Sequence, residues 1–309
     1  MATNLNQNCL SPKVKVYPVS PHYIRVIPRL DIKGPNLVKG IHFEGLRVLG
    51  KPEDFARFYY ENGADELIYI DAVASLYGRN SLVDIVERTS KKIFIPLTVG
   101  GGLRNLDDIR AVLRAGADKV SINTAAINRP DLIREASRTF GSSTIVVSIE
   151  AIKKPDGSYE PYVDYGRQST GLDAFEWAKK AADLGAGELL VTSIDNEGTG
   201  QGFDLDLTLK ISGLVSIPVI ASGGAGKISH ILRVIKEGKA DAVSVASILH
   251  YNYVQHKGCY SSDFKKEGNI EFLLGKRGMK LSSNIQDTTI SQIKNDLLKN
   301  DIACRWQEN

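Results

Sequence analysis

Residues 98–124 read TVGGGLRNLDDIRAVLRAGADKVSINT, and residues 221–247 read ASGGAGKISHILRVIKEGKADAVSVAS. Each stretch runs from β-branched residues through a glycine turn and a helical segment to an Ala-Asp pair and a second β-rich run. Six matched pairs share one spacing of 123 positions, the first being Gly100 with Gly223. This internal repeat predicts two copies of one strand–helix–strand unit, because parallel strands need a helical crossover of about this length.

The glycines of both units fall between a strand and a helix. At such a position backbone N–H groups and the helix dipole favour an anion. Thr124 and Ser247 are predicted to end the next strand in their units, where each adds a hydroxyl donor. One glycine turn alone would be explained by a tight connection. Two equivalent turns, each followed by a hydroxyl, favour two similar phosphate cups.

Eight apolar runs alternate with helical segments along the chain, at residues 23–32, 66–71, 93–99, 119–123, 144–150, 188–194, 217–221 and 242–247. Strands that are apolar throughout are buried on both faces, as in parallel sheets. Eight such units predict an α/β fold, a (β/α)8 TIM barrel with a half-barrel internal repeat. A doubly wound open sheet is the alternative, but it would not need this repeat.

The chain has 309 residues, enough for one barrel of about 250 residues with extensions. We expect residues 1–21 to form an N-terminal arm and residues 22–309 to form a single barrel. An insert is expected at about 250–288, after the eighth strand. The hydrophobic content of 42% and the charged content of 24% are typical of a soluble globular protein.

The same composition excludes several classes of protein. The apolar runs are too short to span a membrane, and the polar first residues do not resemble a secretory signal. The scattered basic residues behind the net charge of +3 form no nucleic-acid interface. Three widely spaced cysteines predict a reducing, cytoplasmic location. We expect no cofactor and no metal, since His250, His256 and Cys259 fit no common ligand set.

Two carboxylates are predicted at the mouth of the barrel, where TIM-barrel chemistry takes place. Asp31 ends the first strand and Glu150 ends the fifth, so they face each other across the mouth. Such a pair can act as general acid and base. A single strand-end acid would more simply cap a helix or pair with Lys33 or Lys153, but the symmetric positions favour catalysis.

Four charged residues begin strands at the opposite, N-terminal face of the barrel: Arg25, Glu66, Lys119 and Glu188. Inward-facing charges are costly unless they are paired. Two cations and two anions can close a salt-bridged ring, and taken alone this ring is best interpreted as a stabilising layer.

Together these residues resemble HisF, the family of cyclase subunits of imidazole glycerol phosphate synthase in histidine biosynthesis. The similarity runs from about residue 24 to residue 246 and resumes in the last helix. The most specific segments are LDIKGPNLVKG (30–40), DELIYID (65–71), TVGGG (98–102), ADKVSINTAA (117–126), LLVTSIDNEGT (189–199) and IASGGAGK (220–227).

The resemblance implies a concrete activity and concrete partners. A glutaminase subunit docked at the N-terminal barrel face would release ammonia, which would pass up the barrel to a phosphorylated small-molecule substrate. That substrate is a bis-phosphate ribonucleotide, which is cleaved and cyclised.

The resemblance also implies roles for individual residues. Asp31 falls on the first catalytic aspartate of the family, Glu150 on the second, and Lys39 on a lysine that contacts substrate. Glu197 falls on a further active-site aspartate. The two phosphate sites fall on Gly102, Asn123 and Thr124, and on Gly198, Gly224, Ala246 and Ser247. The family's ammonia gate matches the charged ring of Arg25, Glu66, Lys119 and Glu188. The resemblance therefore implies that this ring is a gate and not only a stabilising layer.

The sequence departs from the family at its acid–base site. Glu150 and Glu197 stand where the family has aspartates, and GPN occupies 34–36 where the family usually has an Asp-Gly-Arg type sequence. One extra methylene displaces a carboxylate by more than an ångström, which can cost ~10²-fold in rate. Two hypotheses therefore stay open. The retained phosphate cups favour the cyclase, a lyase-type enzyme. The altered acids favour a paralogue that channels ammonia from a glutaminase to a sugar amidotransferase in surface-polysaccharide biosynthesis.

Overall fold

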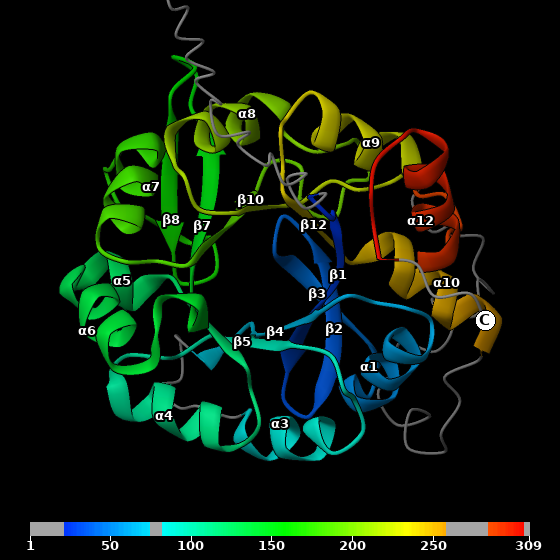
Figure 1. The fold of residues 1–309 in the computed structure, drawn as a ribbon, viewed down its shortest axis with the longest axis horizontal. Coiled ribbons are helices and arrows are strands. Elements are labelled where there is room, and N and C mark those ends of the chain that lie inside the picture. Colours follow the sequence, from blue (N-terminus) through cyan, green and yellow to red (C-terminus); the bar gives the residue numbers. More distant parts are fainter. Residues whose placement is uncertain (1–21, 75–81, 258–283, 306–309) are drawn as a thin grey trace, which may run out of the picture.

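Eight parallel strands form a closed ring in the computed structural model, which describes residues 22–74, 82–257 and 284–305 (Figure 1). The strands are β1 (Arg25–Lys33), β4 (Leu67–Asp71), β5 (Leu97–Gly100), β6 (Lys119–Ile122), β7 (Ile145–Lys153), β10 (Glu188–Ser193), β11 (Val219–Ser222) and β12 (Ala242–Val245). Each strand pairs in parallel with the next, and β12 pairs with β1 to close the ring. The predicted (β/α)8 barrel is confirmed.

Helices surround the ring and cover its outer face (Figure 1). They are α1 (Pro52–Glu61), α3 (Val83–Ser90), α4 (Leu106–Arg114), α5 (Thr124–Asn128), α6 (Asp131–Phe140), α7 (Ala174–Asp183), α8 (Leu205–Leu214), α9 (Ile228–Lys236), α10 (Ser247–Lys257) and α12 (Ile290–Lys299), with a 3₁₀ turn η1 (Ser142–Thr144). Several begin at a side-chain cap that satisfies the free backbone N–H groups of the first turn. Asn105 caps α4, Asp173 caps α7 and Asp204 caps α8.

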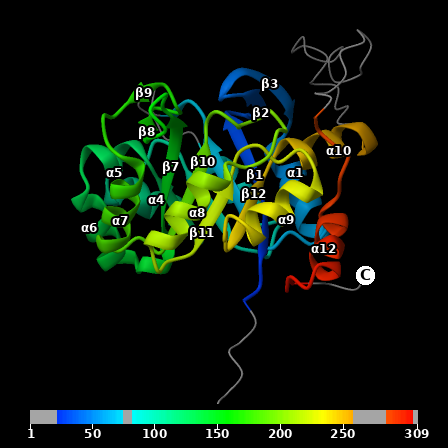
Figure 2. The same ribbon diagram turned by 90° about the horizontal axis from the view of Figure 1, so that it is seen from above.

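Two antiparallel hairpins extend the barrel sheet. β2 (Asn36–Ile41) and β3 (Glu44–Gly50) continue from β1, whereas β8 (Tyr159–Val163) and β9 (Gln168–Ser169) continue from β7. Figure 2 shows both hairpins at the same end of the barrel. Pro155, Asp156 and Gly157 lie in the turn between β7 and β8. The β2–β3 hairpin was not predicted.

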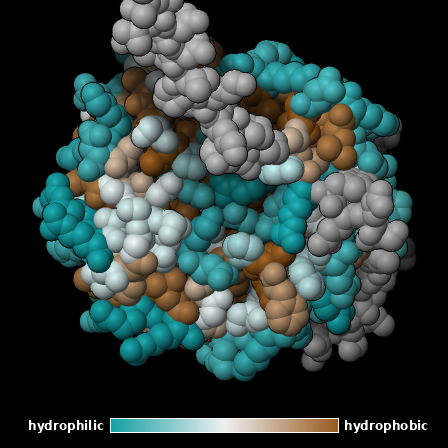
Figure 3. Space-filling model, viewed as in Figure 1, coloured by the Kyte–Doolittle hydropathy of each residue, from teal (hydrophilic) through white to brown (hydrophobic). Residues whose placement is uncertain are grey.

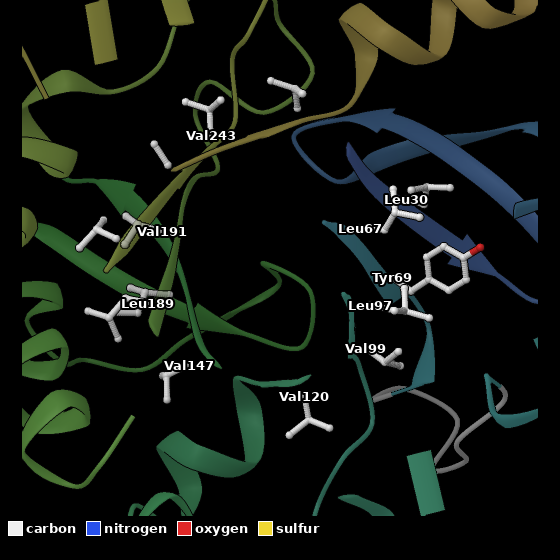
Figure 4. Packing of buried hydrophobic residues seen from close by; sticks show 14 of the residues in the cluster. Leu30, Leu67, Tyr69, Leu97, Val99, Val120, Val147, Leu189, Val191 and Val243 are labelled. Atoms are coloured by element: carbon white, nitrogen blue, oxygen red, sulfur yellow. The ribbon is translucent and has the colours of Figure 1, made fainter. Parts of the chain in front are cut away.

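Most barrel strands are buried on both faces, and several are apolar on both. Along β4, Leu67 and Tyr69 pack outward against the helices, whereas Ile68 and Ile70 belong to a second cluster inside the barrel. Figure 4 shows the outward layer, including Leu189 and Val191 of β10. Successive side chains of a strand point to opposite faces, so burial of both faces explains the continuous apolar runs of the sequence.

The structure corrects the alignment of the two repeat units. Gly101 and Gly102 have φ values of 94° and 72°. Gly223 and Gly224 have φ values of 90° and 101°, so the glycine turns match at a spacing of 122 positions (101 to 223), not 123. The second unit has one extra residue after α9, and Lys239 takes the left-handed conformation there, with φ of 57°.

Beyond that extra residue the spacing of 123 holds, and the repeated aspartates have the same structural role. Asp118 Oδ2 accepts a hydrogen bond from Leu97 N at 2.9 Å. Asp241 Oδ2 accepts one from Val219 N at 2.8 Å. Each aspartate therefore fixes the start of its own strand to the start of the preceding strand.

The two hydroxyl residues of the repeat open helices instead of ending strands. β6 ends at Ile122 and Thr124 begins α5, while β12 ends at Val245 and Ser247 begins α10. The first part of the expected insert, from residue 250, belongs to α10. Residues 258–283 of that insert and the expected arm at 1–21 lie outside the described residues. None of the helices in the described ranges has the length and apolar character needed to cross a membrane.

Candidate active site

A cavity of about 510 Å³ lies at the carboxyl ends of β4, β5, β6 and β7. Its wall includes Gly102, Asn123 and Thr124, the residues of one predicted phosphate site, and also Glu150. Barrels of this class bind their ligands at this end of the strands. The cavity is therefore the candidate active site.

Asp31 and Glu150 both lie beside one buried guanidinium. Arg29 donates from Nε to Asp31 Oδ1 at 2.9 Å, and its Nη2 lies 4.0 Å from Glu150 Oε1. The three residues are 2%, 1% and 4% exposed, in the order Arg29, Asp31, Glu150. The structure thus brings the two predicted carboxylates to one mouth and joins them through a cation.

Glu150 is poised to exchange protons near neutral pH. Burial raises the pKa of Glu150 to about 7. Arg29 opposes this shift, whereas the negative charges of Asp31 and Glu197 add to it. A carboxyl group that titrates in this range can act as a general acid at physiological pH.

Lys39 and Glu197 form a buried ion pair in the same mouth. Lys39 Nζ donates to Glu197 Oε1, and the two residues are 3% and 4% exposed. Burial alone would lower the pKa of Lys39, but the carboxylates of Glu197 and Asp31 raise it. Lys39 is therefore a permanent positive charge at the mouth.

The β2–β3 hairpin is fixed to the loop that follows β10. His42 N donates to Glu197 O at 2.9 Å, and His42 Nδ1 lies 2.8 Å from Ile194 O. Because a carbonyl oxygen only accepts, Nδ1 carries the proton. Gly198 has φ of 75° and lies so close to Gly40 that an added Cβ would be 2.5 Å from the Gly40 carbonyl oxygen. The hairpin therefore covers this side of the mouth.

The second predicted phosphate site is much smaller than the first. Gly198, Gly224, Ala246 and Ser247 line a cavity of about 10 Å³, roughly the space of one water molecule. Side chains of Arg29 and Glu197 form part of the same wall. The repeat predicted two similar cups, but the two sites differ in size. The side chains of Arg29 and Glu197 line the second site and are not part of the wall of the first.

Hydrogen bonds to β7 and to the β8 region hold the polar residues of the first site in place. Asn123 Nδ2 donates to Glu150 Oε2 at 3.3 Å and to Tyr162 O at 3.1 Å. Thr124 Oγ1 accepts a hydrogen bond from Asp164 N at 3.1 Å. These bonds tie the first site to the β8 side of the mouth.

The four charged residues at the N-terminal face meet in a ring. Arg25 Nη1 lies 2.7 Å from Glu66 Oε1 and 3.0 Å from Glu188 Oε1. Lys119 Nζ lies 3.0 Å from Glu66 Oε2 and 3.1 Å from Glu188 Oε1. Each anion therefore contacts both cations. In the view down the barrel, hydrophilic residues gather at its centre (Figure 3).

Comparison with known proteins agrees with the motifs and the fold. A protein-family model described as histidine biosynthesis protein matches residues 25–255. An imidazole glycerol phosphate synthase subunit HisF of Legionella pneumophila is 58% identical over 207 residues, covering 67% of this chain and 98% of that protein. The chain belongs to the HisF family. A HisF subunit of Methanocaldococcus jannaschii is 51% identical over 246 residues, covering 74% of this chain and 90% of that protein. The predicted activity, that of the lyase-type cyclase subunit, agrees with these HisF names.

Arg29 is the residue of this HisF mouth that the sequence analysis missed. It lies two positions before Asp31 on β1, and side chains two apart on a strand share a face. That alternation, applied to RVIPRLDI, would have placed Arg29 inside the barrel with Asp31. The distances to Glu150 and Thr192, by contrast, depend on strands far away in the sequence.

The histidines that were considered as metal ligands have other contacts. His250 is buried, with Nδ1 2.6 Å from Tyr59 OH and Nε2 2.9 Å from Arg29 O. His256 Nε2 lies 2.6 Å from Asp287 Oδ2. Within the described ranges, no three His, Cys, Asp or Glu side chains group as metal ligands, and Cys259 lies outside those ranges.

Proposed function

We propose that this mouth catalyses the ammonia-dependent cleavage and cyclisation of a bis-phosphate ribonucleotide, which forms imidazole glycerol phosphate. The observation that carries the proposal is the buried pair Asp31 and Glu150, joined through Arg29 beside a cavity of about 510 Å³. Two carboxyl groups in different surroundings can divide the roles of acid and base.

The surroundings of the two carboxyl groups support a division of these roles. Glu150, whose pKa lies at about 7, is the proton donor. Asp31, which accepts a hydrogen bond from Arg29, is the carboxylate that takes a proton. Glu150 occupies the second catalytic position in place of an aspartate, and its burial makes it suitable as the acid.

Ammonium-dependent turnover of the ribonucleotide by site variants tests this assignment. Asp31→Asn should lower kcat by ~10²–10⁴-fold, since it removes the base without changing the shape of the site. Glu150→Asp restores the family side chain and should maintain or raise the rate. If Asp31→Asn keeps the wild-type rate, Asp31 is not catalytic.

Two phosphate sites are proposed to orient the ribonucleotide. Gly102, Asn123 and Thr124 would bind one phosphate group, and Gly198, Gly224, Ala246 and Ser247 would bind the other. The cavity at the second site has room for little more than a water molecule, so we expect its lining side chains, Glu197 among them, to shift when phosphate binds. Crystals soaked in phosphate should show an anion at both sites. Sites that remain filled by side chains would contradict this class of substrate.

We also propose that ammonia enters through the ring of Arg25, Glu66, Lys119 and Glu188 from a glutaminase subunit at the N-terminal face. The four side chains surround the barrel entrance and are 9–22% exposed. Lys119→Ala should change glutamine-dependent turnover by the complex much more than ammonium-dependent turnover by the barrel alone. Equal effects on the two rates would argue for a purely stabilising ring.

One observation favours a second candidate function, the channelling of ammonia to a sugar amidotransferase. Arg29 and Glu197 line the second phosphate site, whose cavity of about 10 Å³ has room for little more than a water molecule. A channelling barrel would show no turnover of the ribonucleotide. Glutamine-dependent amination of a sugar by its partner enzyme would instead require this barrel.

A further inference from the structure

Arg29 reaches across the inside of the barrel. Its backbone belongs to β1, and its Nη1 donates to Thr192 Oγ1 on β10 at 3.2 Å. Its Nη2 faces Glu150 on β7, which lies four strands from β1 in the eight-stranded ring and therefore opposite to it. The guanidinium thus occupies the barrel interior directly beneath the mouth.

One nitrogen of this guanidinium is buried without a hydrogen-bond partner. Arg29 Nη2 has none among the described residues, and Glu150 Oε1, at 4.0 Å, is just beyond bonding distance. An unpaired buried N–H of a charged group costs free energy, so a native structure that keeps one calls for an explanation. The ring of Phe43 lies 5.2 Å from Arg29 Cζ and covers it on another side.

The position of Arg29 is fixed from several directions. Asp31 holds Nε and Thr192 holds Nη1. His250 Nε2 donates to the Arg29 carbonyl, since a carbonyl only accepts, and His250 Nδ1 then accepts from Tyr59. Burial lowers the pKa of His250 to about 3, so this ring stays neutral and keeps that arrangement. Of the three guanidinium nitrogens, Nη2 is the one that has no hydrogen-bond partner among the described residues, so it is placed to respond to a change of charge on Glu150.

We propose that Arg29 is a positioning residue for the acid–base pair: it orients Asp31 as the carboxylate and receives the carboxylate of Glu150 after Glu150 has given up its proton. The proposal rests on the proposed function. In the step concerned, the O–H bond of Glu150 breaks and its proton passes to the substrate atom that gains negative charge. Glu150 becomes an anion, and the free N–H of Nη2 closes on it. A donor held this close to the place where charge develops needs only a small movement to stabilise that charge.

Several other charged and polar groups face Glu150. Asp31 and Glu197 act on it as anions, and Asn123 donates to its Oε2. Tyr165 lies beside it with a pKa raised well above the ordinary value, chiefly by burial, so it is neutral. The wall of the large cavity adds Asp71, Arg104, Arg129 and Asp164. Lys39 pairs with Glu197 and also acts on Asp31. Arg29 is the cation that acts most strongly on Glu150 itself, so its removal takes away the largest charge that opposes the raised pKa of Glu150.

A direct titration of the Glu150 carboxyl group tests the proposal without using activity. Protein labelled with ¹³C at glutamate carboxyl carbons is titrated by NMR, and the Glu150→Gln variant identifies the signal. Arg29→Met should raise the Glu150 midpoint by at least about one pH unit, a tenfold change in proton affinity. Arg29→Lys keeps the charge and should keep the midpoint within a few tenths of a unit. An unchanged midpoint in folded Arg29→Met, or equal shifts in the Met and Lys variants, would overturn the proposal.

Arg29→Gln replaces Arg29→Met in this titration if the Met variant does not fold. The glutamine amide has no charge but can still form a hydrogen bond to Asp31 or Thr192. The same upward shift is expected in this variant, and an unshifted midpoint would again contradict the proposal. The pH profile of ammonium-dependent turnover has a limb that reports the ionisation of Glu150. In the variants without the Arg29 charge, this limb should shift by as much as the NMR midpoint. In Arg29→Lys, the limb should lie at its wild-type pH. A wild type without ribonucleotide turnover would overturn the proposed function, whereas the titration would still decide whether Arg29 governs the charge of Glu150.

Discussion

Glu150 holds its proton to a higher pH in the folded barrel than in the unfolded chain. Its pKa is about 7 when folded, against an ordinary value of 4.5, so folding takes up a proton between these two pH values. Stability therefore falls as the pH rises from about 4.5 through 7, and the cost levels off above that range at about 3 kcal/mol. Glu150→Gln, which cannot ionise, should be more stable than wild type at pH 8 and closely similar to it at pH 4.5.

Denaturant unfolding of both proteins at several pH values measures this difference. Glu176→Gln on α7 is a suitable control, because Glu176 is exposed in the first turn of its helix and should show no such trend. A Glu150→Gln variant that loses stability equally at pH 8 and pH 4.5 would show that the carboxyl group is not held protonated.

The carboxylates Asp31 and Glu150 were predictable from the sequence, but Arg29, whose guanidinium lies between them in the structure, was not. Asp31 and Glu150 follow apolar runs at symmetric positions, so the chain itself places them at the mouth. Arg29 stands inside an apolar run, where its charge is tolerated only because Asp31, Thr192 and Glu150 surround it. Two of these partners come from strands whose distance and register the sequence does not give.

The last helix, α12, is anchored to the barrel by a buried ion pair. Lys294 Nζ lies 2.7 Å from Asp65 Oδ1 and also donates to the Arg305 carbonyl. The other oxygen of Asp65 accepts from Val26 N on β1. Lys294 and Asp65 are 4% and 6% exposed, so loss of one partner leaves an uncompensated buried charge.

Lys294→Met should therefore lower the free energy of unfolding by about 3–5 kcal/mol. Adding Asp65→Asn removes the stranded charge and should recover a large part of that loss, since the amide oxygen can still accept from Val26 N. Chemical denaturation of both variants measures the two values. A double variant no more stable than Lys294→Met would contradict the ion-pair explanation.

Two glycines in different surroundings give a matched prediction about backbone space. Gly224 has φ of 101°, and a Cβ there would collide with the Gly202 carbonyl. Gly224→Ala should therefore cost more than about 1 kcal/mol and weaken binding of inorganic phosphate. Gly213 lies in α8 with open space around it, and Gly213→Ala should stabilise by about 0.5–1 kcal/mol. Thermal unfolding and phosphate titration separate the two effects. Equal stability changes at both positions would contradict the steric argument.

Elements with a repeated pattern were predicted well, and the hairpin over the mouth was missed. Eight strands and their crossovers follow from apolar runs and glycine turns. The hairpin of β2 and β3 turns at His42 and Phe43, which have φ of 52° and 62° although neither is a glycine. The usual glycine or asparagine signal for a turn is absent at these two positions. The one-residue error in the repeat has a similar cause, because Lys239 takes a left-handed conformation that sequence does not indicate.

Large apolar side chains surround the N-terminal end of the barrel. Tyr23, Phe94 and Leu214 precede β1, β5 and β11 and are 52%, 81% and 49% exposed. They lie around the entrance that the charged ring occupies. Apolar and aromatic side chains of this kind are the usual anchors of a protein interface, so they support docking of the proposed glutaminase subunit at this face.

Phe94→Ser should weaken association with the glutaminase by about tenfold or more, because truncation of an aromatic anchor commonly costs over 1 kcal/mol. Leu172→Ser is the matched control, since Leu172 is also exposed but lies just before α7, at the opposite end of the barrel. Titration calorimetry measures both affinities. If Leu172→Ser weakens binding and Phe94→Ser does not, the partner docks at the other face.

At the scale of the whole molecule, the repeat was sufficient to predict the closed barrel but not the inequality of its two halves. Both halves carry glycine turns and a following hydroxyl residue. Their cavities of about 510 and 10 Å³ differ, and the side chains of Arg29 and Glu197 line the smaller one. These two side chains come from β1 and from the loop after β10, which are distant in the sequence.

The most direct measurement of the central claim is the wild-type rate of ribonucleotide turnover with ammonium as the nitrogen source. The purified barrel is incubated with ammonium and the bis-phosphate ribonucleotide, and the products are identified by mass. We expect formation of imidazole glycerol phosphate, with the rate reduced by ~10²–10⁴-fold in Asp31→Asn. Absence of turnover in a wild type that still binds the phosphate groups would contradict this expectation and would favour the channelling function.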